Sequence, residues 1–302
     1  MNNNVNKKTN IDAVLIGYKK VGTTLLRNFF DEHPQIDWSR EGAYFLLSDT
    51  KIENKKDDYI NKIEQLSNHI NIDMYEQLSI ATINKTKIDS FSPNETLSFD
   101  TFYCASSEVA KRIKETLGNV KIIITIREQT DWLSAYYLHH LITLKPKDRS
   151  FKKFIKTPEG KCVLNAGFYD RTIETYHQFF GKENVFVLPI EQIKRDFTNS
   201  FNELSNFLGI EPIDFKFKSV NKGIGSTNGK LVMMASKLGI SDDFLKKLKP
   251  LYQYIKPMLS HSKNSSILKK DEIELIKSLY SASNLNTQRL IDYDLKELGY
   301  CI

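Results

Sequence analysis

The stretch IDAVLIGYKKVGTTLLRNFF, residues 11–30, decides the fold of this chain. It begins with a continuous apolar run, typical of a buried strand, that ends at Gly17. A short turn with two lysines follows, and a helical pattern begins near Gly22 and Thr23. The first backbone N–H groups of a helix have no intrahelical acceptor, and the helix dipole favours an anion beside them. The stretch therefore predicts a strand, a phosphate-binding loop and a helix, in that order.

The loop departs from the pattern of nucleoside triphosphatases. Their loop reads G-x-x-x-x-G-K-[ST], and Gly17 and Gly22 keep its glycine spacing here. However, Thr23 stands at the lysine position, while Lys19 and Lys20 lie inside the loop. We therefore expect a phosphate group to bind here without the usual geometry of a triphosphate and its magnesium ion.

The composition is that of an ordinary globular protein that suits an anionic ligand. Of the 302 residues, 40% are hydrophobic and 26% charged, and 43 basic against 37 acidic side chains give a net charge of +6. No basic tract with interleaved aromatic residues is present, so we expect no nucleic-acid partner. The cysteines Cys104, Cys162 and Cys301 lack paired or metal-ligand spacing, so we expect neither a metal site nor a disulfide framework.

Three features predict a cytoplasmic protein. The first ten residues, MNNNVNKKTN, are polar and lack the apolar core of a signal peptide. No apolar run in the sequence approaches the roughly 20 residues that a membrane-spanning helix requires. The isolated cysteines also fit a reducing compartment.

The alternation of strand and helix patterns predicts one α/β domain over residues 1–302. Continuous apolar runs, typical of buried parallel strands, occupy 12–17, 96–100, 120–127 and 184–189. Helical patterns occupy 23–32, 106–117, 131–144, 168–180, 198–208 and 271–298. This order predicts a P-loop-like, three-layer fold with a central parallel sheet flanked by helices. We expect residues 50–95 to form a lid or substrate-facing insertion and residues 216–268 to be a partly irregular region that closes over the ligand.

A second informative stretch is KIIITIREQTDWLSAYYLHH, residues 121–140. Its apolar run delivers Arg127 to the carboxyl end of a strand, where ligands collect in parallel α/β sheets and where the first loop should also lie. Ser134 follows in the next helix. An arginine offers planar donors suited to a phosphate, and a serine adds a hydroxyl donor. On their own, these two residues could equally be a surface ion-pair partner and an ordinary helix residue.

Together the two stretches resemble the sulfotransferases that use 3′-phosphoadenosine-5′-phosphosulfate (PAPS), specifically the branch of heparan-type and bacterial carbohydrate sulfotransferases. Residues 20–24, KVGTT, are similar to the family's 5′-phosphosulfate loop, and the KIIITIRE strand is similar to its 3′-phosphate strand. Residues 40–45, REGAYF, resemble the family stretch K-E-x-x-F/Y-F. Further similarity lies in GFY at 167–169, FFGKENVFVLPIEQI at 179–193 and FLGI at 207–210. These matches follow the family order over most of the chain.

The resemblance implies that Lys20 contacts the oxygen that bridges the sulfate and the 5′-phosphate. An ammonium placed where negative charge develops on the leaving phosphate stabilises the transition state more than the ground state. Val21, Gly22, Thr23 and Thr24 would hold the 5′-phosphosulfate group through N–H and hydroxyl donors. A solvated loop lysine and a plain helix N-terminus with threonine capping are the alternative interpretations.

The resemblance also implies that Glu41 is the catalytic base, which takes the proton from an acceptor hydroxyl as it attacks sulfur. A neutral sugar hydroxyl is a poor nucleophile, so a carboxylate within hydrogen-bonding distance is chemically needed. The family usually has lysine where Arg40 stands and often histidine where Ala43 stands, so a surface Arg–Glu pair is an alternative interpretation. His33 is a competing base, although His-Pro after a helix is more typical of a structural stop.

Arg127 and Ser134 correspond to the family pair that holds the 3′-phosphate. The family serine usually follows the arginine by eight positions, whereas Ser134 follows by seven and Ala135 takes the eighth. Lys222 and Gly223 resemble part of the element that closes over the 3′-phosphate. A flexible basic loop is the alternative interpretation of those two residues.

The sequence thus predicts a PAPS-dependent sulfotransferase that needs no metal. It would transfer a sulfuryl group to a hydroxyl of a carbohydrate, such as a bacterial surface polysaccharide, a glycolipid or a precursor, and release adenosine 3′,5′-bisphosphate. Transfer to a small alcohol or phenol is the alternative within the enzyme class. A non-catalytic PAPS- or nucleotide-binding protein is the alternative of another class. An ATP-dependent kinase is disfavoured, because it would require a lysine in place of Thr23.

Overall fold

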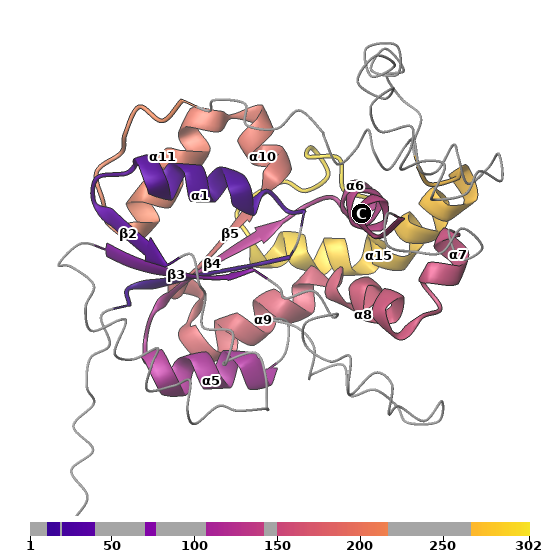
Figure 1. Cartoon of the computed structure of the whole chain (residues 1–302), viewed down its shortest axis with the longest axis horizontal. Coiled ribbons are helices and arrows are strands. Elements are labelled where there is room, and N and C mark those ends of the chain that lie inside the picture. Colours follow the sequence, from indigo (N-terminus) through magenta and orange to yellow (C-terminus); the bar gives the residue numbers. More distant parts are fainter. Residues whose placement is uncertain (1–10, 19, 40–69, 77–106, 142–149, 217–266) are drawn as a thin grey trace, which may run out of the picture.

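In the computed structural model, five strands form one parallel sheet in the order β2-β3-β1-β4-β5 (Figure 1). The structure describes residues 11–18, 20–39, 70–76, 107–141, 150–216 and 267–302. The strands are β1 (Ala13–Gly17), β2 (Ile36–Ser39), β3 (Ile70–Glu76), β4 (Lys121–Ile126) and β5 (Val185–Pro189). Strand β1 is central and all of its residues are buried. The predicted parallel sheet is confirmed.

Helices cover both faces of the sheet (Figure 1). One face carries α1 (Thr23–Glu32), α10 (Ile190–Arg195) and α11 (Phe197–Leu208), and the other carries α5 (Ser107–Leu117) and α9 (Tyr169–Phe180). Helices α6 (Gln129–Leu141), α7 (Phe151–Phe154) and α8 (Pro158–Ala166) lie on the side toward which the strand arrows point, and α15 (Lys270–Leu290) extends from there to the sheet. A short 3-10 turn, η4 (Lys182–Asn184), leads into β5. The predicted three-layer arrangement is confirmed.

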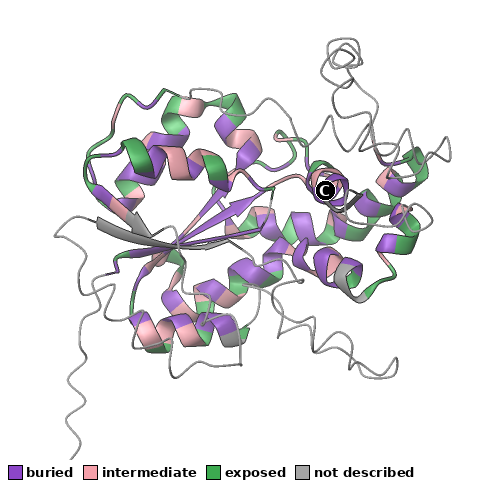
Figure 2. Ribbon diagram, viewed as in Figure 1, coloured by how far each residue is buried: buried purple, intermediate pink, exposed green. Residues whose placement is uncertain are grey.

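Each face of the sheet has its own hydrophobic core, because successive side chains of a strand point to opposite faces. Ala13 and Leu15 of β1 pack with the residues of α1 and α11. Val14 and Ile16 pack on the other face, in a core that includes the fully buried Trp132 of α6. Figure 2 shows that the helices turn their buried residues toward the sheet. The central strands are therefore buried on both sides, as their unbroken apolar runs predicted.

The observed bounds are close to the predicted ones for the elements around the loop. Strands β1, β4 and β5 lie within one residue of their predicted ranges, and α1 has the predicted range. Helix α15 ends at Leu290, before the predicted end at 298, and Ile291 is extended with φ of −124°. Asp292 and Asp294 follow, and negative charges are unfavourable at a helix C-terminus. The predicted strand at 96–100 lies outside the described residues.

Strands β2 and β3 were not predicted. Strand β3 pairs with β1 on one side and β2 on the other, so it is an inner strand of the sheet. It belongs to the 50–95 segment that we expected to be an insertion, so this part of the segment is core structure. The sequence of β3, INIDMYE, mixes polar and apolar residues and lacks the continuous apolar run by which a buried parallel strand is recognised.

Helix α15 is joined to α6 and α9 by buried polar side chains. The amides of Gln129 and Asn284 bond reciprocally, with donor–acceptor distances of 2.6 and 3.1 Å. The buried carboxylate of Asp170 accepts a hydrogen bond from the Ser283 hydroxyl. A buried polar group that loses its partner costs its full desolvation penalty. These bonds therefore define how α15 packs against the domain.

Replacing Asn284 with alanine should lower the free energy of unfolding by about 2 kcal/mol, because Oε1 of the buried Gln129 then loses its donor, whereas Nε2 keeps its bond to the Gly167 carbonyl oxygen. Urea denaturation measures this loss. Asp271→Asn is the control. It removes a 2.6 Å ion pair to Lys152, but both side chains are more than half exposed, so the unfolding midpoint should barely change. Equal losses in the two variants would contradict the importance of the buried amide pair.

Candidate active site

The loop between β1 and α1 is anchored at both ends and has an unusual backbone at Lys20. Tyr18 and Val21 are fully buried, and the Tyr18 hydroxyl lies 2.8 Å from that of Thr172 in α9. Lys20 is exposed and has φ of 73°, in the left-handed region that residues with a side chain rarely adopt. The loop therefore presents the Lys20 side chain to solvent from a strained backbone.

The two glycines that flank the loop are required by the space around them. Gly22 has φ of 89°, and a Cβ at this position would lie 2.3 Å from Cδ1 of Ile190 in α10. Gly17 pairs with Thr125 of β4, and a Cβ there would lie 2.8 Å from the Thr125 hydroxyl oxygen. Glycine thus lets the loop pack closely against β4 and α10. The two glycines that the sequence analysis selected for their spacing are also the ones that the packing demands.

Helix α1 begins at Thr23, directly after the loop. Gly22 is its N-cap and supplies no side-chain hydrogen bond, and the first turn contains no acidic residue. Thr23 is buried, whereas Thr24 is exposed. The positive end of the helix dipole and the exposed Lys20 therefore lie next to each other in the chain, an arrangement that can hold an anion.

Arg127 follows the last residue of β4 and reaches the loop. Its Nη1 donates to the carbonyl oxygen of Lys20 at 3.1 Å, and its Nη2 lies 3.5 Å from Oδ2 of Asp131. Its own carbonyl oxygen accepts a 2.7 Å hydrogen bond from the Tyr169 hydroxyl. Its Nε is buried and has no hydrogen-bond partner in the described part of the chain. The structure therefore brings Arg127 and Lys20 together, as predicted.

Ser134 lies in α6 on the side of the helix that carries Asp131. At 3.6 residues per turn, positions three and four residues further on lie about 60° and about 40° to either side of Asp131. Ser134 and Ala135 occupy these positions, and both are half-buried. The observed seven-residue spacing from Arg127 and the usual eight-residue spacing therefore fall on the same face of the helix. The role of Ser134 at the 3′-phosphate stays a prediction.

Three predicted site residues cannot be placed. Glu41, Lys222 and Gly223 lie outside the described residues, as does Lys19, so the roles inferred for them stay predictions. Within the described ranges, no group of three or more His, Cys, Asp and Glu side chains could hold a metal ion. No helix in the same ranges is long and apolar enough to cross a membrane.

His33, the competing base, has a structural role. It is buried, its Nε2 donates to the Glu211 carbonyl oxygen at 3.0 Å, and its Nδ1 accepts from the Gln35 N–H at 3.2 Å. These partners define the neutral tautomer that carries its proton on Nε2. Burial lowers the pKa of His33, which also favours the neutral ring. With both nitrogens engaged, His33 is not available to take a proton from a substrate.

Glu191 lies beside the loop and was not predicted. It follows Ile190, whose side chain lies against Gly22, and its Oε2 accepts a 2.9 Å hydrogen bond from the Tyr300 hydroxyl. Its Oε1 is buried without a hydrogen-bond partner among the described residues. Burial raises the pKa of Glu191, and hydrogen bonds including that from Tyr300 oppose this rise. An acid in the first turn of a short helix is common, so the sequence offered no signal for this arrangement.

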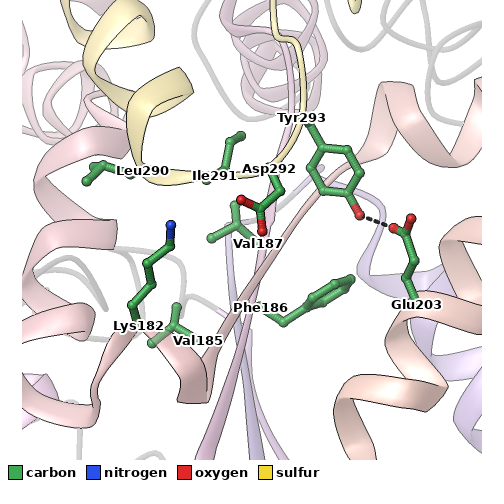
Figure 3. Close-up of a pocket in the computed structure, with 9 residues that line it drawn as sticks. All are labelled: Lys182, Val185, Phe186, Val187, Glu203, Leu290, Ile291, Asp292 and Tyr293. Atoms are coloured by element: carbon green, nitrogen blue, oxygen red, sulfur yellow. Dashed lines mark hydrogen bonds between the residues drawn. The ribbon is translucent and has the colours of Figure 1, made fainter.

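A pocket of about 290 Å³ lies at strand β5 (Figure 3). It is lined by Lys182, Val185, Phe186, Val187, Glu203, Leu290, Ile291, Asp292 and Tyr293. Lys182 and Asp292 both point toward its interior (Figure 3). Its strand residues precede the carboxyl end of β5, whereas the loop follows the carboxyl end of β1. We therefore assign the candidate active site to the loop and not to this pocket.

A glycine-flanked loop at the carboxyl edge of a parallel sheet, with an arginine from the neighbouring strand, is typical of P-loop-like α/β proteins. Comparison with models of protein families identifies the family to which the chain belongs. The family model of the sulfotransferase domain matches residues 10–222. This chain belongs to the sulfotransferase family and has the P-loop-like fold of that family.

Solved structures of sulfotransferases resemble the chain. The sulfotransferase from Alicyclobacillus acidocaldarius has a TM-score of 0.58 and 16% identity, with 95% of this chain and 98% of that chain covered. The sulfotransferase domain of the Synechococcus PCC 7002 olefin synthase has a TM-score of 0.40 and 15% identity, with 90% and 95% covered. Mouse sulfotransferase SULT7A1 in complex with PAP has a TM-score of 0.36 and 15% identity, with 75% and 64% covered. A search of curated protein sequences found no match.

Gly22→Ala should lower the free energy of unfolding by more than about 2 kcal/mol, because it adds a steric overlap with Ile190 to a left-handed backbone. Gly118→Ala is the matched control. Gly118 has φ of 76°, but no atom lies within 4 Å of the place that a Cβ would take, so only the backbone strain of about 1 kcal/mol should appear. Combining Gly22→Ala with Ile190→Val, which removes Cδ1, should cost less than the sum of the two changes. Strict additivity would contradict the overlap.

Glu191→Gln should change how stability depends on pH. Because burial raises the pKa of Glu191 above 4.5, its contribution to stability is full below that pH and is lost as the pH rises through the folded-state pKa. The variant lacks this loss, so its stability relative to the wild type should increase from about pH 4.5 toward neutrality. Urea denaturation at a series of pH values measures the difference. A difference independent of pH would contradict the raised pKa.

Proposed function

We propose that this sulfotransferase transfers a sulfuryl group from PAPS to a carbohydrate hydroxyl. The observation that carries the proposal is the 3.1 Å contact between Arg127 and the Lys20 carbonyl. PAPS bears a phosphosulfate on the 5′ position and a phosphate on the 3′ position of one ribose, so its binding site needs two phosphate-binding elements that lie close together, on either side of that ribose. The resemblance assigns the Lys20 loop to the first group and Arg127 to the second, and their adjacency supports that assignment.

The first element would be the loop and the start of α1. Backbone N–H groups of Gly22, Thr23 and Thr24 at the positive end of the helix would hold the 5′-phosphate, and Val21 would anchor the loop from the core. PAPS, when bound, supplies an activated sulfuryl group, and its transfer to a hydroxyl releases adenosine 3′,5′-bisphosphate. Lys20 would stabilise the negative charge that develops on the leaving phosphate oxygen.

The second element would hold the 3′-phosphate. The guanidinium of Arg127 and the Ser134 hydroxyl would donate to it from the end of β4 and from α6. Lys222 and Gly223 would complete this element by the family resemblance. In this proposal the positive charge at the site comes from side chains and from a helix end, and no metal ion takes part.

Glu41 would serve the acceptor side of the reaction. Its carboxylate would take the proton from the attacking hydroxyl, which turns a poor nucleophile into a competent one. The neutral, hydrogen-bonded state of His33 supports this choice between the two candidate bases. The resemblance of the Glu41 segment to the carbohydrate branch is the basis for proposing a glycan acceptor.

Calorimetric titration should show that adenosine 3′,5′-bisphosphate binds more tightly than ATP with Mg²⁺, because the site holds separate 5′ and 3′ phosphates. Ser134→Ala should weaken the binding of the bisphosphate by about tenfold, which corresponds to the loss of one charge-assisted hydrogen bond. It should leave the binding of adenosine 5′-phosphate unaffected. Tight ATP binding with indifference to the bisphosphate would overturn the donor assignment.

Lys20→Ala should reduce sulfate transfer from labelled PAPS to a glycan panel by at least about 10²-fold, the scale of losing one group that stabilises developing charge. The protein should stay folded because the side chain is exposed. Lys182→Ala, which removes an exposed lysine at the β5 pocket, is the matched control and should keep wild-type transfer. Wild-type turnover in Lys20→Ala would refute its role. Transfer only to small alcohols or phenols would show that the acceptor is a small molecule and not a glycan.

A further inference from the structure

The backbone of Lys20 needs support from outside the loop. A residue with a side chain in the left-handed region costs about 1–2 kcal/mol relative to an ordinary conformation. Such a conformation persists where the surroundings hold it. The carbonyl oxygen of Lys20 accepts a hydrogen bond from Nη1 of Arg127, a residue 107 positions later in the chain. This contact acts on the residue that the proposed reaction uses.

Arg127 is itself well placed to give that support. Its carbonyl oxygen is held by the hydroxyl of Tyr169, which is fully buried. The Tyr169 ring packs against Tyr18, the first residue of the loop, with 5.8 Å between ring centroids, and against Trp132 of α6 at 6.2 Å. One aromatic cluster therefore holds both the start of the loop and the backbone of the arginine.

The guanidinium has enough donors to serve the loop and a phosphate together. An arginine side chain carries five N–H donors in a fixed plane. Nη1 donates to the loop through one of its two N–H groups, and among the described residues Nη2 makes a 3.5 Å contact to the exposed Asp131. Holding the Lys20 carbonyl therefore leaves donors for an anionic ligand.

We propose that Arg127 is a positioning residue for Lys20. Its guanidinium holds the left-handed loop through the Lys20 carbonyl oxygen, and so orients the Lys20 side chain before any ligand binds. The part of this inference that concerns turnover rests on the proposed function, whereas the ordering of the loop does not. The role is additional to phosphate binding, and it links the two phosphate-binding elements through one side chain.

Hydrogen–deuterium exchange on the ligand-free protein tests the ordering of the loop without any donor. In Arg127→Gln, the amides of Val21 and Leu25, which donate to the carbonyl oxygens of Tyr18 and Gly22, should exchange about tenfold faster than in the wild type, because the loss of one charge-assisted hydrogen bond makes local opening easier. Asp131→Asn is the control, since it removes the other contact of the guanidinium and keeps the one to Lys20. Its loop should exchange at the wild-type rate. Unchanged exchange in Arg127→Gln would overturn the proposal.

Arg127→Lys provides a second variant should the glutamine variant fail to fold. A lysine keeps a positive charge but loses the planar donor array, so the amides of Val21 and Leu25 should exchange faster than in the wild type. Wild-type protection in a folded Arg127→Lys variant would likewise overturn the proposal.

Kinetics with PAPS separates positioning from phosphate binding. At saturating PAPS, Arg127→Gln should lower kcat by about tenfold or more, because a displaced Lys20 stabilises the transition state less. Ser134→Ala, which removes a predicted phosphate contact without touching the loop, should mainly raise KM for PAPS. A wild-type kcat with a raised KM in Arg127→Gln would overturn the positioning role. Absence of PAPS turnover in the wild type would instead refute the proposed function. The exchange experiment would still test whether Arg127 orders the loop.

Discussion

The register between β1 and β4 is the constraint on which the site depends. Gly17 pairs with Thr125, so the two parallel strands end at the same level and their continuations leave the sheet side by side. Lys20 is three residues beyond Gly17 and Arg127 is two residues beyond Thr125, which places them within hydrogen-bonding distance. Because side chains alternate along a strand, a slip of one residue would turn the apolar side chains of β4 to the wrong core. The packing that builds the two cores thus also aligns the two phosphate-binding elements.

Short-range patterns predicted much of the fold. The strand, loop and helix around Lys20 were recognisable because an unbroken apolar run, a glycine turn and a helical pattern follow one another within about twenty residues. The closeness of Arg127 and Lys20 was predictable as well, since parallel strands bring their carboxyl ends to one edge of the sheet. Strand β3 escaped prediction because its polar residues interrupt the apolar pattern, although its position between β1 and β2 is an inner one.

Long-range contacts account for what the sequence did not predict at the site. The hydroxyls of Tyr18 and Thr172 meet across 154 positions, and Tyr300 reaches Glu191 across 109. No local pattern contains such pairs. The left-handed backbone of Lys20 was equally hidden, because lysine has no preference for that conformation and tertiary contacts impose it. The assignment of His33 followed from its two hydrogen-bond partners, which only the fold supplies.

The reciprocal amide pair of Gln129 and Asn284 has a consequence for synthesis on the ribosome. The two residues are 155 positions apart, and Asp170 also finds its partner Ser283 in α15. While the chain is being translated, α6 and α9 therefore expose polar groups whose partners have not yet been made. Domains generally acquire structure from the N-terminal end during translation. Here the half of the domain around α6 and α9 therefore reaches its final packing only after α15 has been synthesised.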